Sequence, residues 1–158
     1  MRTKLALVAV TIAAVIAPAA AIAVEQDTPA IDPARQAMAP AATLTARSTR
    51  FGTILFAGNG RALYGFTRDQ RNGPSRCYGD CAVAWPVYFA KGTLKAGAGV
   101  KQSLLGTTRR RDGRRQITYN GWPLYYYVDE KAGEVKCQNV VTHGGTWLVV
   151  RPAGNLVR

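Results

Sequence analysis

The chain contains two copies of one sequence unit, and this internal repeat constrains its fold more than any other feature. Asn59-Gly60 is followed by Leu63-Tyr64-x-Phe66, and Asn120-Gly121 is followed by Leu124-Tyr125-x-Tyr127, with the same offset in residue number at every matching position. Farther along the chain, the offset changes by one position. It is one shorter between Cys77 and Cys137, and one longer between the Trp-x-Val sequences that begin at Trp85 and Trp147. Two copies of one structural unit are therefore expected.

Each copy carries the signals of a β-hairpin. An Asn-Gly pair between two apolar runs favours a type I′ turn, because both residues tolerate positive φ. A third hairpin is predicted at Asp112-Gly113, between the strands 107–111 and 114–119, and 146–150 is expected to be a closing strand. Only Val100–Leu105 has a helical pattern, and it is long enough for a turn or two. The predicted fold class is all-β.

The aromatic residues of the repeat indicate which strand face is buried. Side chains alternate along a strand, so Tyr64 and Phe66 share one face, as do Tyr125 and Tyr127. The opposite face carries Gly65 in one copy and an aromatic residue in the other, so only the first face matches between the copies. We therefore expect these aromatic side chains to form a common core in which two tandem hairpin units pack as one small sandwich-like or barrel-like domain.

The chain divides into three segments. These are a signal peptide at 1–23, a flexible tether rich in Ala and Pro at 24–49, and a repeat domain at 50–158 with units at about 50–90 and 107–152. Arg2 and Lys4 precede an uncharged apolar run, and Ala21-Ile22-Ala23 offers the small residues that signal peptidase reads. We expect cleavage after Ala23 and export to the periplasm or the outside of the cell.

The expected mature chain is strongly basic. Removal of residues 1–23 takes away two basic residues and no acidic one, which leaves 19 Lys and Arg against 9 Asp and Glu, a formal charge of +10. Five arginines surround the Asp112-Gly113 turn and form the candidate anion-binding set: Arg109, Arg110, Arg111, Arg114 and Arg115. Across a hairpin these side chains come close together. Plain solvent exposure is the alternative explanation.

At these motifs the chain resembles a family of bacterial secreted repeats, often lipoproteins, that carry a Tyr-x-(Phe/Trp/Tyr)-x-x-Asp motif. The first unit has the full motif at Tyr64, Phe66 and Asp69, and the second has Tyr125 and Tyr127 with Glu130 in the last position. The resemblance covers about residues 51–152 and implies export and tandem repeats. It implies no established reaction, and the cysteine that would anchor a lipoprotein is absent from this chain.

Asp69 and Glu130 are the candidate chemical groups of the motif. They occupy equivalent places in the two units, and a pair that faced each other across a pseudo-twofold axis would have the chemistry for acid–base catalysis or Ca²⁺ binding. The alternative is that each carboxylate accepts backbone N–H bonds where its hairpin ends. A repeated motif favours this structural role.

Three cysteines allow one disulfide and one remaining thiol. Cys77–Cys81 would close a short loop, whereas Cys77–Cys137 or Cys81–Cys137 would join the two units. A metal site of these three cysteines with His143, the only histidine, is a further alternative that would suit Cu(I) or Zn²⁺.

The function that follows is a binding or structural module with a basic surface, and neither catalysis nor a cofactor is expected. Its partners would be anionic envelope polymers or lipid headgroups, and no specific nucleic-acid recognition is expected. The alternative is a redox or metal-handling envelope protein that uses its cysteines and His143.

Overall fold

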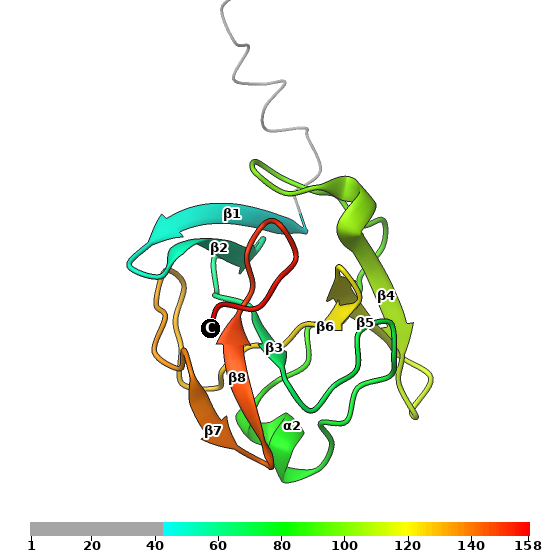
Figure 1. The fold of residues 1–158 in the computed structure, drawn as a ribbon. Helices are drawn as coiled ribbons and strands as arrows, with labels where there is room; N and C mark the ends of the chain where they lie inside the picture. Colours follow the sequence, from blue (N-terminus) through cyan, green and yellow to red (C-terminus); the bar gives the residue numbers. More distant parts are fainter. Residues whose placement is uncertain (1–42) are drawn as a thin grey trace, which may run out of the picture. The chain divides into compact units, whose positions relative to one another are not determined.

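The computed structural model describes residues 43–158 (Figure 1). The signal peptide, its cleavage site and most of the predicted tether lie outside the described residues. The elements are β1 (Leu44–Thr49), β2 (Gly52–Ala57), β3 (Tyr64–Phe66), α2 (Asp80–Ala84), a 3-10 helix η1 (Gln102–Leu104), β4 (Leu105–Arg109), β5 (Arg115–Tyr119), β6 (Trp122–Pro123), β7 (Val140–Thr142) and β8 (Gly145–Val149). In this part of the chain, no helix has the length and hydropathy to cross a bilayer.

Three small antiparallel sheets build the domain, with strand orders β1-β2, β3-β8-β7 and β4-β5-β6. The last four residues of β2 are buried on both faces of the strand, so their successive side chains enter two different hydrophobic clusters. Ile54 and Phe56 of β2 belong to an aromatic core, and Leu55 and Ala57 belong to a second core with Leu44. The all-β, sandwich-like prediction is confirmed, whereas the sheets do not close into a barrel.

The repeat domain begins earlier than the sequence indicated. The composition of Leu44–Thr49 predicts part of the flexible tether, but this segment forms β1 and pairs with β2 along its whole length. Leu44 is separated from Leu105, the first residue of β4, by the same offset that separates the two Asn-Gly turns, so β1 and β4 are equivalent strands of the two units. The small and polar residues of β1 resemble the Ala-rich and Pro-rich stretch before it, so the sequence pattern does not indicate a strand there. Its stability comes from the ladder with β2 and from the burial of Leu44.

The hairpin turns follow two geometries. Asn120-Gly121 has φ of 48° and 77° at its two positions, which confirms the predicted type I′ turn. Asn59-Gly60 differs, because only its glycine has positive φ, and the Ala57 N–H donates to the Arg61 carbonyl across a three-residue loop. This is a type I turn followed by a left-handed glycine. The predicted hairpin at Asp112-Gly113 is confirmed and has the same geometry.

Helical structure in residues 43–158 is limited to two short segments. The pattern at Val100–Leu105 yields one 3-10 turn, η1. The sequence did not indicate α2, which has five residues and lies between Gly79, with φ of 57°, and Trp85. A disulfide from Cys81 in α2 to Cys77 fixes this turn beside the aromatic core. So short a helix depends on tertiary contacts, and its own sequence carries little signal.

Each unit completes the backbone pairing of the other. In the first unit, the Leu55 N–H donates to the carbonyl of Val150, which follows β8 of the second unit, at 2.8 Å. In the second unit, the Ile117 N–H donates at 2.8 Å to the carbonyl of Tyr88, which belongs to the first unit. The two bonds are equivalent under the repeat. Without the other unit, each unit would therefore leave a backbone N–H group of its sheet without an acceptor.

Four aromatic rings form a column in which the two units alternate. Phe66 stacks on Trp147 with ring centroids 4.1 Å apart, and Trp147 stacks on Trp85 at 3.9 Å. Tyr127 packs on the other side of Trp85 at 5.1 Å. The order Phe66, Trp147, Trp85, Tyr127 thus takes rings from the first and second units in turn. Tyr64 and Tyr125 belong to the same hydrophobic cluster as this column, which confirms that the aromatic positions of the repeat face a shared core.

The interlocked strands predict that one unit cannot fold alone. A fragment of residues 43–98 keeps the first unit but loses Trp147 and the strand that pairs with Leu55. We expect circular dichroism and urea titration of this fragment to show an unfolded chain, whereas residues 43–158 unfold cooperatively. A cooperative unfolding transition in the isolated fragment would contradict this interdependence.

Candidate functional site

The motif carboxylates are held by the tyrosines of the opposite unit. Tyr64 and Tyr125 pair through their backbones, with N–H to carbonyl distances of 2.9 and 3.0 Å. The Tyr125 hydroxyl donates to Asp69 Oδ2 at 2.6 Å, and the Tyr64 hydroxyl donates to Glu130 Oε1 at 2.5 Å. The four side chains are buried. The motif therefore works as a reciprocal clasp between two units.

The structure gives Asp69 and Glu130 separate sets of partners. Asp69 also accepts the Arg76 N–H at 2.7 Å, and Glu130 accepts the Lys136 N–H at 2.5 Å. Burial raises the pKa of the Asp69 carboxyl, although its bonds to Tyr125 and the Arg76 N–H oppose that shift. Each carboxylate accepts a backbone N–H bond where its own hairpin ends, which is the structural role that the repeated motif favours. The arrangement supports neither a joint acid–base pair nor a shared cation site.

The cysteines form the disulfide Cys77–Cys81, so the bridge lies within the first unit. Cys137 is a free and buried thiol, and burial raises its pKa, with the charge of Glu130 as a further cause. The alternative metal site is wrong, because two of its four ligands are consumed by the disulfide. His143 has φ of 52° and forms the tight turn between β7 and β8.

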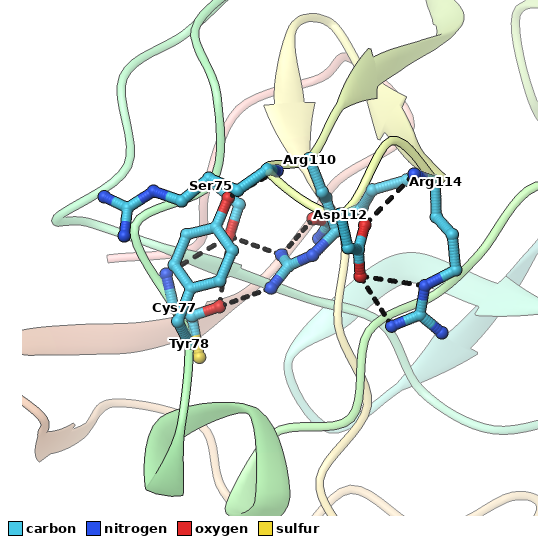
Figure 2. A network of polar contacts seen from close by, with 8 residues as sticks. Ser75, Cys77, Tyr78, Arg110, Asp112 and Arg114 are labelled. Carbon is cyan, nitrogen blue, oxygen red and sulfur yellow. Dashed lines mark hydrogen bonds and ion pairs between the residues drawn. The ribbon is translucent and has the colours of Figure 1, made fainter.

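Arg110 differs from the other arginines of the hairpin. It is only 6% exposed, and its guanidinium donates to Ser75 Oγ at 2.7 Å, Gln116 Oε1 at 2.8 Å and the Cys77 carbonyl at 2.7 Å. Figure 2 shows this guanidinium between Ser75 and Cys77. The sequence-based set of five surface arginines is therefore wrong for Arg110, which ties the second unit's hairpin to the first unit.

The remaining four arginines are exposed and point to two sides of the hairpin. Arg114 turns back to Asp112 at 2.7 Å, as Figure 2 shows, and Arg115 donates to Thr107 Oγ1 at 2.9 Å. Arg111 lies over the Tyr78 ring, 4.5 Å from its centroid. Together with Arg109, Arg111 lines a surface hollow beside the first unit.

This arginine hollow has a volume of about 650 Å³. Its lining residues are Arg68, Pro74, Ser75, Arg76, Tyr78, Arg109, Arg110 and Arg111. Five of the eight are arginines and none is acidic. Arg68 and Arg76 come from the loop after β3, far from the hairpin in sequence, and sequence reasoning missed them. The correspondence between the two copies carries no signal that this loop folds against the hairpin of the other unit.

The equivalent region of the second unit is not basic. At the places of Arg68 and Pro74 it has Asp129 and Glu134, and at the place of Arg76 it has Lys136. Lys136 is neutralised there by Glu134 at 2.7 Å. The same backbone thus folds without a cluster of arginines, so the charge of the arginine hollow is not a requirement of the fold.

Arg110 is predicted to stabilise the fold, unlike its neighbour. In Arg110→Met, Gln116 Oε1 loses its donor, whereas Ser75 Oγ and the Cys77 carbonyl each lose one of theirs. An unsatisfied buried polar group costs about 1 to 3 kcal/mol. We expect urea unfolding to show a loss of about 2 kcal/mol or more in the free energy of unfolding. The control Arg109→Met removes the same charge from an exposed position and should leave that free energy nearly unchanged. Equal losses of unfolding free energy in the two variants would show that the buried hydrogen bonds of Arg110 do not stabilise the fold.

The buried tyrosines predict a loss of stability at alkaline pH. Burial raises the pKa of Tyr64 and Tyr125 above the ordinary value of about 10. Between that value and the raised one, the unfolded chain releases phenol protons that the folded chain retains, so the free energy of unfolding falls as pH rises. Tyr125→Phe, compared at pH 9 and pH 11, should show a smaller fall than wild type. A fall in Tyr125→Phe as large as that of wild type would contradict this cause.

A family model described as a secreted repeat of unknown function matches the chain twice, over residues 45–88 and 106–151. The two matches together cover more than half of the 158 residues. Each match begins one residue inside the first strand of its unit, and the matches end at Tyr88 and just after Val150, whose carbonyls pair with the other unit. No curated protein and no solved structure matches the chain significantly. With two interlocked units of this repeat, the chain belongs to the family of secreted repeats of unknown function and is an exported protein.

Proposed function

We propose that this exported protein is a non-enzymatic binding module whose arginine hollow holds the anionic groups of an envelope polymer. The observation that carries the proposal is the gathering of five arginines, from both units, around one hollow with no acidic lining residue. Like charges that line one hollow repel one another, and an anionic ligand would relieve that repulsion.

The hollow is organised before any ligand arrives. Arg110 is fixed at its base by three hydrogen bonds, and Tyr78 lies against the guanidiniums of Arg110 and Arg111 with distances of 4.2 and 4.5 Å to the ring centroid. Arg68 keeps one bond to the His143 carbonyl at 3.2 Å. Arginines held in this way lose less conformational entropy on binding, and their planar donors suit phosphate or carboxylate groups.

The surface around the hollow favours a water-soluble polymer over a lipid bilayer. The large hydrophobic side chains that are well exposed in residues 43–158 are Val83, Val128 and Val141, and none of them lines the hollow. A headgroup site at a membrane would gain from apolar side chains beside its basic residues. The formal charge of +10 on the expected mature chain would speed encounters with any polyanion.

The proposal includes a location. The Ala21-Ile22-Ala23 sequence supports removal of the signal peptide after Ala23. The described disulfide supports an oxidising compartment, which is the periplasm or the outside of the cell.

The experiment replaces the four hollow arginines that are exposed, Arg68, Arg76, Arg109 and Arg111, with Ser. Heparin is the probe, as a soluble polyanion. Binding of this kind releases counterions, so affinity falls with salt, and each lost contact should lower the slope of log K against log salt by about 1. We expect the quadruple variant to elute from heparin at clearly lower salt than wild type and to keep the wild-type melting temperature.

The matched control replaces four exposed basic residues that lie outside the hollow: Lys95, Lys101, Lys131 and Arg158. It removes the same net charge. Equal weakening by the two variants would mean that net charge alone drives binding and would refute the hollow as the site. Tighter binding of wild type to anionic vesicles than to heparin would favour a lipid partner over a polymer and overturn that part of the proposal.

A further inference from the structure

We infer that the arginine hollow is one end of a continuous track, and that the track takes a linear anionic polysaccharide several sugar units long. The inference rests on the proposed function and adds the class of ligand and its course over the surface. It starts from four hollows whose lining residues overlap in a chain. The arginine hollow shares Arg109 with a second hollow of about 470 Å³ beside β4 and β5.

The chain of hollows passes around the β4–β5 hairpin. The second hollow shares Thr107 and Arg115 with a third, of about 500 Å³, which also contains Arg114. The third shares Phe89 with a fourth, also of about 500 Å³. Neighbouring hollows that share side chains lie next to one another on the surface. The four therefore form a path that runs from Arg76 at one end to Lys91 at the other.

The charge along the path has one sign. None of the residues that line the four hollows is acidic, and arginines or a lysine occur in each of them. Asp112 lies beside the path but is paired with Arg114 at 2.7 Å. A path of this kind matches a polymer with repeated negative charges better than a single small anion, which would use one hollow only.

The far end of the path has the chemistry of a sugar site. The fourth hollow is lined by the rings of Tyr88 and Tyr126, whose centroids lie 5.1 Å apart, with Asn59 and Thr93 as polar neighbours. Arg61 lies over Tyr126, 4.6 Å from the ring centroid. Aromatic faces with flanking polar groups suit the apolar face of a pyranose ring and its hydroxyls. Inorganic polyphosphate, which has no rings, would gain nothing there.

The test compares heparin oligosaccharides of increasing length, from a disaccharide to a dodecasaccharide, by calorimetry. Affinity should rise with length until the chain spans the path. In Lys91→Ser, affinity for the longest chain should fall about threefold, the scale of one exposed charge contact, while the disaccharide is bound as by wild type. The control is Lys95→Ser, which removes the same charge from the same loop outside all four hollows. It should bind both lengths as wild type does.

The outcomes separate a failure of the track from a failure of the proposed function. Equal effects of Lys91→Ser and Lys95→Ser, or affinity independent of length, would overturn the track and leave the arginine hollow intact. If the wild-type protein bound none of the oligosaccharides, the proposed function itself would be overturned. Tyr126→Leu, with its folding checked by melting temperature, should weaken the dodecasaccharide but not polyphosphate of similar charge. Equal weakening of both would overturn the sugar class of the ligand.

Discussion

The domain depends on the reciprocal bonding of two tyrosines to two carboxylates. Tyr64 and Tyr125 pair through their backbones at the junction of the units, and each hydroxyl caps the motif carboxylate of the other unit. A buried carboxylate without such donors would carry a desolvation cost of several kcal/mol. The same contacts set the aromatic rings in alternating order and bring the exchanged strands into register. The motif is therefore a device for joining units, and its conservative change to Glu130 in the second unit keeps that chemistry.

The sequence predicted what is local and what is repeated. The constant offset between the two copies, the Asn-Gly and Asp-Gly turns and the paired aromatic positions indicate two hairpin units with a common core, because each is written in neighbouring residues. What failed depends on distant contacts. The strand at 44–49 is stabilised by its ladder, and Arg110 is buried because Ser75 and Cys77 come to it from the other unit. The hollow with Arg68 and Arg76 arises only after the units interlock.

The two units use the same backbone for different chemistry. Where the first unit presents Arg68 and Arg76, the second presents Asp129 and a neutralised Lys136. The side chains at these positions lie outside the clasp and the aromatic column, and the clasp carboxylates use only the backbone N–H of Arg76 and Lys136, so the fold does not fix which side chains stand there. The basic hairpin and the disulfide also occur once each. The internal repeat thus separates a part that both units must keep from a surface that each can vary.

The exchange of backbone partners between the units has a consequence for how the fold assembles. A chain with a single unit would leave Leu55 or Ile117 without its backbone partner, and the simplest way to supply that partner is a second molecule of the same chain. Residues 43–158 thus have the organisation of a symmetric homodimer whose halves are joined covalently, by the segment between Ala90 and Gln102. Fusion makes assembly independent of concentration, which suits a protein that is diluted after export, and it frees the two halves from identical sequences.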